Sequence, residues 1–392
     1  MKYHRVGCRE WGNFLLDTPQ IYVDIYQTRI PKYRELFFKR LIQLGMLDNI
    51  TYKIIVSSDR QKKFNFESEM NLNIVEKKTR VLNLRGREFH FQFSSLVGSD
   101  ADLVICEYGL KNFIVYWFLF IKKPKNFAFW GHGQTKTKPS WKVEKFVKRK
   151  LLQRAKFFFA YTKACASKLM EINYPKSRIQ IVNNSIDTGA LIEGIQVITD
   201  LEIKSYRNVL GLEPGDIVLI YIGSLEKEKR IRFLLDAFQL INDKRPHAKL
   251  FIYSPDCFES LKYINKLKNV FIMGEADIDR KVRLALISTA LLNPGRVGLI
   301  AVDSFAMGVP IITTDWEFHA PEYSYLNNAN SITTQDTLEK YVDGCLTLID
   351  EAELRNKLVN GCKQSVDLFS IESMAKNFHS GVLKALGDQN VR

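Results

Sequence analysis

The sequence has few cysteines, and none of them is spaced like a metal ligand. The six are spread along the whole chain, with no CxxC pair and no neighbouring histidine at metal-ligand spacing: Cys8, Cys106, Cys165, Cys257, Cys345 and Cys362. This spacing argues against a disulfide framework and against a zinc ribbon. Reduced thiols are typical of cytosolic proteins, so we expect the cysteines to be free.

The sequence also lacks a long apolar run. Its most apolar segment, residues 113–121 (FIVYWFLFI), is about half as long as a helix that spans a bilayer, and we expect it to be a buried element. The first residues, MKYHRVGCREWGNF, lack the apolar core and cleavage site of a signal peptide. We therefore expect a cytoplasmic protein that is at most peripheral, at the inner face of the membrane.

The length and the hydrophobic content predict two folded domains. A domain usually contains roughly 100–200 residues, and this chain has 392. No segment has the low hydrophobicity of a disordered region. Two domains imply a cleft, where small-molecule sites commonly lie.

The formal charge of +14 is compatible with nucleic acid, an anionic membrane surface or anionic ligands as partners. The segment from Lys136 to Lys156 places Val143, Phe146 and Leu151 on one face of a helix and lysines and arginines on the other. It is either a solvated basic helix or a helix that contacts anionic lipid headgroups. Because no aromatic-basic recognition module is present, we expect no nucleic-acid partner.

Strand and helix patterns alternate along the chain in two units. In the first, residues 20–195, apolar strand-like segments lie at 21–27, 51–58, 102–107, 126–133, 157–162 and 179–185. In the second, residues 205–370, they lie at 216–225, 248–254, 269–274, 290–295 and 309–315. This alternation predicts an α/β fold with two Rossmann-like, doubly wound domains.

Three further segments lie outside these two sheets. Residues 1–19 form an N-terminal extension, and residues 371–392 contain a final amphipathic helix. Residues 188–212 are polar and lack a strand pattern, so we expect them to connect the domains.

The first ligand-binding pattern follows the strand at 217–222. Gly223 and Ser224 lie at the carboxyl end of that strand, and Lys229 precedes a helix. Backbone N–H groups and a lysine at this place suit a phosphate group. The alternative is an ordinary strand-to-helix turn.

The second pattern is NPGRVGLIAVDSFAMGVPIITTD, residues 293–315. Gly295 and Gly298 allow a close approach to a ligand, and Arg296 could reach a diphosphate at the start of the following helix. Asp303 lies within that helix among apolar residues, where a carboxylate is costly unless it is hydrogen-bonded. A pair of ribose hydroxyls would be a natural partner.

Together with GSLEKEKRIRFLLDAF, this second stretch resembles the donor-binding half of glycosyltransferase family 4. The resemblance is strong over residues 216–315 and weaker at RIPKYRELFFKRL, WGHG and IQIVNNSID. It implies the GT-B fold, in which two Rossmann-like domains face each other across a cleft and the C-terminal helix packs back on the N-terminal domain. It also implies transfer with retention at the anomeric carbon.

The resemblance also implies roles for individual residues. Lys229 resembles the lysine that neutralises the donor diphosphate, Ser224 stands where many members have an arginine, and Asp303 matches the second glutamate of the Glu-x7-Glu spacing. Gly295 occupies the position of the first glutamate, which contacts the donor sugar in the family. Arg296 is expected to replace the charge that is missing at Ser224. The expected donor-binding residues are Gly223, Ser224, Lys229, Arg296, Val297, Gly298, Leu299 and Asp303.

Other residues are expected on the opposite side of the cleft. His132 in WGHG resembles the N-domain histidine of related retaining enzymes, which contacts the sugar or the departing phosphate, and the alternative is a histidine that caps a loop. Tyr33 and Arg34 are acceptor-side candidates or helix-capping residues. His319 and Glu322 resemble a loop near the same cleft.

These features predict a hexosyltransferase-like glycosyltransferase that transfers a sugar from a nucleotide-sugar donor to a glycan or lipid-linked acceptor in surface polysaccharide or lipopolysaccharide biosynthesis. We expect neither a cofactor nor a metal, because no DxD-like acidic pair follows a strand. Two alternatives remain. One is a nucleotide-sugar epimerase with the GT-B fold, and the other is a non-catalytic nucleotide-sugar-binding or scaffold subunit.

Overall fold

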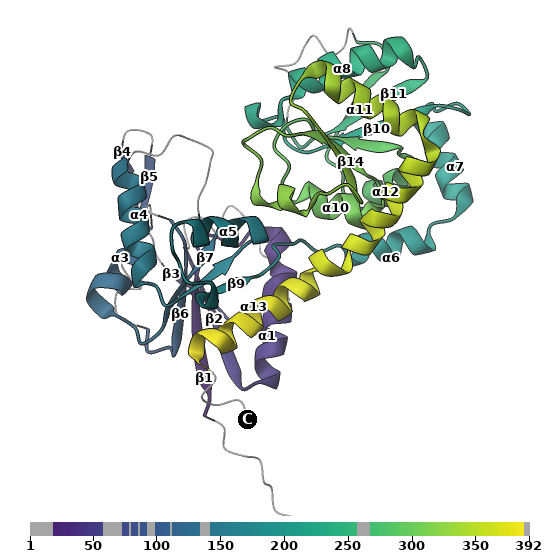
Figure 1. Ribbon diagram of the computed structural model, residues 1–392. Helices are drawn as coiled ribbons and strands as arrows, with labels where there is room; N and C mark the ends of the chain where they lie inside the picture. The colour runs from purple at the N-terminus through teal and green to yellow at the C-terminus, as the bar shows by residue number, and fades with distance from the viewer. Residues whose placement is uncertain are drawn as a thin grey trace, which may run out of the picture.

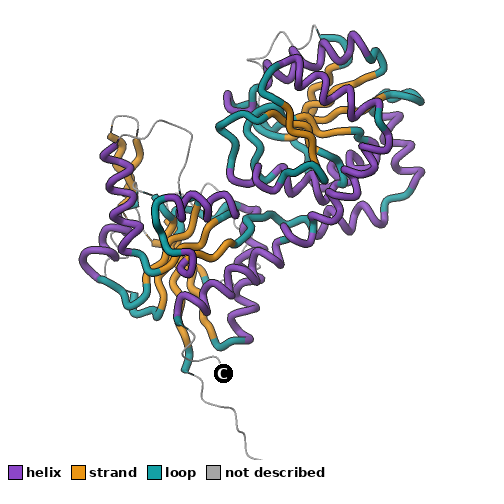
Figure 2. The backbone as a smooth tube through the Cα atoms, in the orientation of Figure 1, coloured by secondary structure: helices purple, strands orange, loops and turns teal. Residues whose placement is uncertain are grey.

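The chain forms two separate α/β domains, each built around a parallel sheet (Figures 1 and 2). The computed structural model describes residues 19–57, 73–77, 80–84, 87–91, 99–109, 112–133, 142–256 and 267–387. The expected N-terminal extension lies outside the described residues except for residue 19. The predicted α/β class is confirmed by the two parallel sheets and the helices that cover them.

The N-terminal domain contains a seven-stranded sheet in the order β3-β2-β1-β6-β7-β8-β9. Its strands are β1 (Ile21–Tyr26), β2 (Ile50–Ser57), β3 (Ile74–Lys77), β6 (Leu103–Glu107), β7 (Phe127–Gly131), β8 (Phe157–Ala160) and β9 (Ile179–Ile181). Its helices are α1 (Glu35–Leu47), α3 (Phe113–Tyr116), α4 (Lys142–Arg154) and α5 (Lys163–Glu171). The antiparallel hairpin of β4 (Arg80–Leu84) and β5 (Arg87–Phe91) contacts α3 through β5.

The C-terminal domain contains a six-stranded sheet in the order β12-β11-β10-β13-β14-β15. Its strands are β10 (Ile217–Ile222), β11 (Ala248–Tyr253), β12 (Val270–Met273), β13 (Ala290–Leu292), β14 (Ile311–Thr314) and β15 (Ser331–Thr334). Its helices are α8 (Ile231–Lys244), α9 (Ile278–Ile287), α10 (Ile300–Met307), α11 (Leu338–Asp350) and α12 (Ala352–Ser365). The strand order reverses between β10 and β13, and such a switch point is where open α/β sheets bind ligands.

The predicted boundary at residue 195 and the predicted polar connection at 188–212 are both wrong. These residues form two helices, α6 (Gly189–Val197) and α7 (Asp200–Val209). Leu191 of α6 and Val282 of α9 belong to one buried cluster of the C-terminal domain. The N-terminal domain therefore ends before Gly189. The polar residues of this segment lie on the solvent-facing sides of α6 and α7. Two of them, Thr199 and Glu202, form the capping box of α7.

The apolar segment at 113–121 is only half buried, which corrects the expectation of a buried element. It forms α3 and a π-helical turn, η3 (Trp117–Lys122). Phe118 and Leu119 are buried against the sheet, whereas Phe120 and Ile121 are exposed. A uniformly apolar sequence hides this division, because every side chain in it is compatible with a core.

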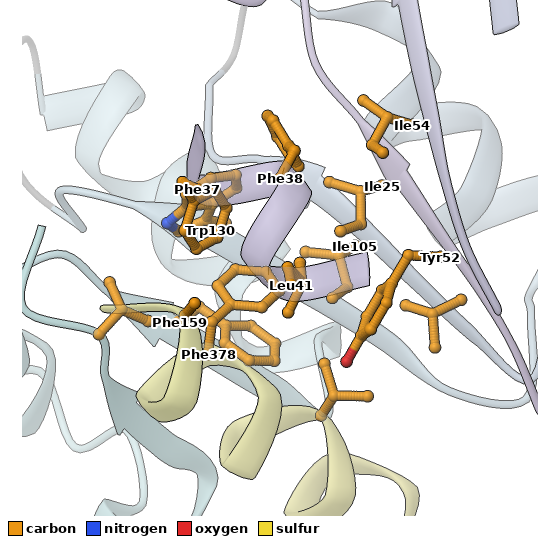
Figure 3. Close-up of a cluster of buried hydrophobic side chains, with 14 of the residues drawn as sticks. Ile25, Phe37, Phe38, Leu41, Tyr52, Ile54, Ile105, Trp130, Phe159 and Phe378 are labelled. Carbon is orange, nitrogen blue, oxygen red and sulfur yellow. The ribbon is translucent and has the colours of Figure 1, made fainter. Parts of the chain in front are cut away.

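The last helix, α13 (Ile371–Leu386), leaves the C-terminal domain and packs on the N-terminal domain (Figure 1). Phe378 lies between Phe37, Trp130 and Phe159, with ring centroids 5.4, 4.9 and 4.4 Å away (Figure 3). The next residue, His379, makes 2.6 Å hydrogen bonds to the Tyr52 hydroxyl and to a carboxylate oxygen of Asp48. The end of the chain thus completes the first core.

Replacement of Phe378 by alanine is expected to lower the free energy of unfolding by about 3–5 kcal/mol, because it removes a fully buried ring from a core that cannot collapse around the space. Urea unfolding followed by tryptophan fluorescence measures the loss. The control is Lys376→Ala, an exposed position on the same helix, which is expected to change the free energy by less than about 0.5 kcal/mol. Equal losses in the two variants would contradict this role of Phe378.

Candidate functional site

The candidate site lies at the carboxyl ends of β10, β13 and β14, where three loops of the C-terminal domain meet. The first loop follows β10 and contains the short helix η5 (Lys227–Lys229). The second joins β13 to α10, and the third follows β14 and leads to η8 (Pro321–Tyr325). Hydrogen bonds between the loops fix their relative positions.

Lys229 is held against the second loop. Its Nζ atom donates a hydrogen bond to the Arg296 carbonyl oxygen at 2.8 Å. Burial lowers the pKa of Lys229, and the nearby Arg296 charge lowers it further. Two cations in one partly desolvated place are costly without an anion. This arrangement therefore suits a negatively charged ligand.

Gly295 explains why the two loops can approach so closely. A Cβ atom at this position would lie 2.4 Å from the carbonyl carbon and oxygen of Lys229. The next amide, of Arg296, donates to the Glu228 carbonyl oxygen at 2.8 Å. Any side chain at 295 would therefore push the Lys229 loop away, and the glutamate of the family pattern does not fit this geometry.

Arg230 secures the same contact from the other side. Its backbone adopts the left-handed region, with φ 55°, which costs a residue other than glycine about 1–3 kcal/mol. Its guanidinium donates to the Pro294 carbonyl oxygen at 3.2 Å, pairs with Asp336 and lies over the ring of Phe233. These contacts offset the backbone strain and tie three loops together. The sequence pattern did not identify this residue.

His319 links the second and third loops as a neutral ring. Its Nδ1 accepts a hydrogen bond from the Val297 amide at 3.0 Å, and its Nε2 donates to the Thr314 carbonyl oxygen at 2.9 Å. Burial lowers the pKa of His319 to about 4, so the ring is neutral at pH 7. Because the Val297 amide already donates to His319, this amide supports the loop, and the role of Val297 in donor binding stays a prediction.

The start of α10 supplies free donors next to these cations. Gly298, Leu299 and Ile300 lie at the point where the helix begins, so their amides have no acceptor one turn earlier. The positive end of a helix dipole favours anions at this place. Arg296, Gly298 and Leu299 are thus brought together with Lys229, as the sequence suggested.

Asp303 lies in the first turn of α10 and is buried. Its Oδ2 atom is 2.9 Å from Nζ of Lys281 on α9. The partner that a buried carboxylate requires is therefore present within the protein. A ribose would have to share Asp303 with Lys281, a residue that the sequence patterns did not single out.

Gly223 and Ser224 lie where β10 ends, as predicted. The Ser224 carbonyl oxygen accepts a 2.5 Å hydrogen bond from the Tyr221 hydroxyl, so this part of the turn is fixed from below. A depression opens next to it, at the carboxyl ends of β11 and β12. It is lined by Ser254, Pro255, Asp256, Ile272, Met273, Gly274 and Glu275. Sequence reasoning missed these residues, although each follows or ends a strand on the ligand side of the sheet.

His132 approaches the site from the N-terminal domain. It follows β7, and its ring packs edge-on against Tyr161 with centroids 4.4 Å apart. Its buried Nδ1 atom has no hydrogen-bond partner within the described part of the chain. Burial lowers the pKa of His132 to about 4, with smaller contributions from Arg296 and Arg34. Arg296 belongs to the other domain, so the two domains meet in the electrostatics of this histidine.

Arg34 begins a chain of hydrogen bonds that leads from the N-terminal domain to the C-terminal domain, and its assignment as an acceptor-side residue stays a prediction. It is buried, donates to Oδ1 of Asn184 at 2.7 Å and lies 4.8 Å above the Trp130 ring. The Asn184 amide nitrogen in turn donates to Glu322 of the C-terminal domain at 2.5 Å. Burial raises the pKa of Glu322. Tyr33, by contrast, is exposed at the start of α1.

The comparisons with known proteins agree with this placement. Residues 216–351 match the family model described as "Glycosyl transferases group 1", and this segment holds all of the loops above. The chain is 25% identical over 240 residues to the uncharacterized glycosyltransferase MJ1059 of Methanocaldococcus jannaschii. That match covers 52% of this chain and 57% of the relative, so the chain spans little more than half of the relative's length.

Solved structures match almost the whole chain. Anabaena Alr3699/HepE in complex with UDP has a TM-score of 0.70 at 12% identity, covering 92% of this chain and 99% of that one. A putative UDP-N-acetylglucosamine 2-epimerase from Listeria monocytogenes has a TM-score of 0.61 at 12% identity, covering 93% and 96%. The predicted GT-B fold and the resemblance to glycosyltransferases are confirmed.

Replacement of Gly295 by alanine is expected to lower the free energy of unfolding by about 1–3 kcal/mol, because the new Cβ atom collides with the Lys229 main chain. Gly298→Ala is the matched control in the same loop, since a Cβ atom there would lie 3.7 Å from the Ala320 side chain, an ordinary contact. Thermal unfolding of both variants tests this, and a Gly295→Glu variant as stable as the parent would refute the steric argument.

Proposed function

We propose that the protein is a glycosyltransferase that transfers a sugar from a nucleotide-sugar donor to a glycan or lipid-linked acceptor. The observation that carries this proposal is the anion-binding corner formed by Lys229, Arg296 and the start of α10. It lies inside the segment that matches the Glycosyl transferases group 1 model. The similar Anabaena protein, solved in complex with UDP, favours a uridine nucleotide.

The geometry supports one orientation of the donor. The diphosphate would lie at the start of α10 between Lys229 and Arg296, where the charges that now repel each other gain an anion. The ribose would reach Asp303, in competition with Lys281. The base would then occupy the depression at the ends of β11 and β12.

In this orientation the protein's own groups would stabilise the leaving diphosphate. Lys229, Arg296 and the first amides of α10 are fixed before the reaction, so they need little rearrangement as charge develops on the leaving oxygen. His132 would face the sugar from the other domain as a neutral hydrogen-bonding group, because its pKa is about 4. We propose transfer with retention of anomeric configuration, without a metal or other cofactor.

We further propose a place for this reaction in surface polysaccharide or lipopolysaccharide biosynthesis, at the inner face of a membrane. A lipid-linked acceptor would explain the basic segment from Lys136 to Lys156, part of which forms α4. None of the helices in the described part of the chain has the length and apolar character needed to cross a bilayer. Contact with the membrane would thus be made by a surface of a folded domain.

The proposal is tested by incubating the purified protein with a panel of nucleotide sugars, with and without lipid-linked acceptors, and measuring release of the nucleoside diphosphate. Acceptor-dependent release supports transfer, and NMR of the product gives the anomeric configuration. Loss of activity on chelation with EDTA would contradict metal independence. Interconversion of the donor sugar without an acceptor would instead support an epimerase, a candidate that the Listeria relative favours. Binding without turnover would support a non-catalytic subunit.

Replacement of Lys229 by alanine is expected to weaken UDP binding by about 10- to 100-fold, because it removes a charge-assisted contact of about 1.5–3 kcal/mol. Isothermal titration calorimetry measures the affinity. Lys227→Ala is the control, since Lys227 is an exposed lysine of the same short helix. Uridine, which lacks phosphates, should bind the parent and Lys229→Ala equally well. An equal loss for uridine would show that Lys229 acts on the fold.

Replacement of His132 by alanine is expected to lower kcat by about 10- to 100-fold and to leave UDP affinity nearly unchanged, because the ring faces the sugar and not the nucleotide. His132→Gln, which keeps a hydrogen-bonding group, should recover part of the rate. Since the pKa of His132 is about 4, its protonation should not alter the rate above about pH 5.5. Full activity of His132→Ala at saturating donor would remove it from the site.

A further inference from the structure

The positive charge of this protein is concentrated in one part of the N-terminal domain. Residues 111–178 contain 17 lysines and arginines but only two acidic residues, Glu144 and Glu171. The whole chain has a formal charge of +14, so this one segment accounts for all of it. Such a distribution attracts a polyanionic partner to one face of the molecule.

The same segment exposes large apolar side chains. In η3, Phe120 is 45% exposed and Ile121 is 62% exposed, while Phe118 and Leu119 anchor the turn in the core. Phe146 of α4 is 61% exposed. The turn is π-helical, a rare conformation that occurs often at functional sites.

These apolar side chains and the cations lie on one surface. The Arg154 guanidinium of α4 lies 4.5 Å from the centroid of the Phe120 ring of η3, and Lys150 lies 5.6 Å from that of Phe146. Lys122, Lys123 and Lys125 lie within four residues of Ile121; Lys122 pairs with Asp100 at 3.5 Å, and the other two add positive charge at the edge. Figure 1 shows α3 and α4 on the side of the N-terminal domain that faces away from the C-terminal domain. We call this surface, made by residues 117–125 and 146–154, the η3–α4 face.

We infer that the η3–α4 face docks on an anionic phospholipid membrane, with Phe120, Ile121 and Phe146 in the interfacial layer and the surrounding lysines and arginines on the headgroups. An apolar tip within a ring of cations fits a bilayer surface, whose apolar interior lies directly beneath its negative charges. An aliphatic tip such as Ile121 has no matching group on a nucleic acid. The inference builds on the proposed lipid-linked acceptor, but membrane binding itself requires no turnover.

The inference is tested by cosedimentation of the full-length protein with vesicles of phosphatidylcholine alone and of phosphatidylcholine with an increasing share of phosphatidylglycerol. The parent should bind only the anionic vesicles, and binding should weaken with added salt because headgroup attraction is screened over about 8 Å at physiological ionic strength. Phe120→Ser/Ile121→Ser should lower partitioning about tenfold or more at every salt concentration, since apolar insertion does not depend on salt.

Two further variants separate the contributions. Lys123→Gln/Lys125→Gln/Lys150→Gln/Arg154→Gln should lose the dependence on lipid charge. Met46→Ser/Leu47→Ser is the matched control, because it removes two even more exposed apolar side chains at the end of α1, and it should bind like the parent. Circular dichroism and UDP titration establish that each variant is folded.

Three outcomes would overturn the inference: a parent that ignores lipid charge, a Phe120→Ser/Ile121→Ser variant that binds like the parent, or a control variant that loses as much binding. If the partner of this face were an acidic protein, the parent would show no dependence on lipid charge. UDP release with a delipidated acceptor reports on the proposed function alone. Failure of vesicle binding with intact UDP release would thus reject the docking surface and keep the glycosyltransferase.

Discussion

The contact between Gly295 and the main chain of Lys229 controls the geometry of the candidate site. Because a Cβ atom has no space at position 295, the two loops pack main chain against main chain. This packing places the Lys229 ammonium beside the Arg296 carbonyl oxygen, immediately before the start of α10. The contact between Gly295 and Lys229 therefore has two effects. It brings the anion-binding groups together, and it leaves no space at position 295 for the glutamate of the family pattern. In the proposed donor complex, recognition of the sugar would have to come from other groups, and His132 is the candidate on the opposite domain.

Two clusters maintain this geometry at a distance from the ligand. Arg230 has a strained backbone, and its side chain connects the loops around Pro294 and Asp336. Arg34, Asn184 and Glu322 form a buried chain of hydrogen bonds across the domain boundary. Buried polar groups are costly unless they are satisfied, so this chain favours one relative placement of the domains. The aromatic contacts of α13 also stabilise this placement of the domains, because they join the helix that follows the C-terminal domain to the N-terminal core.

The sequence predicted the elements that have a local pattern of residues. It did not predict contacts or domain membership that depend on tertiary packing. The strands at 217–222 and 290–292 are continuous apolar runs; Lys229 follows the first of them, and Arg296 and Asp303 follow the second at recognisable positions. Lys281 and Arg230 escaped notice because their partners, Asp303 and Pro294, lie 22 and 64 positions away in the chain. Helix α6 was assigned to the wrong domain because its apolar residues suit either core. The steric role of Gly295 becomes visible only once the Lys229 loop is placed above it.

The two halves of the chain differ in net charge. Residues 1–188 contain 34 lysines and arginines and 16 acidic residues, whereas residues 189–392 contain 23 and 27. Half of the lysines and arginines of residues 1–188 lie in residues 111–178, part of them on the η3–α4 face that points away from the C-terminal domain. Arg34 and Lys168, however, place positive charge near His132. The same cations disfavour a proton on that histidine, and burial disfavours it still more. In the proposed donor complex, a diphosphate would weaken the effect of the cations but not the effect of burial. His132 would therefore remain a neutral group that can orient a hydroxyl or a phosphate oxygen.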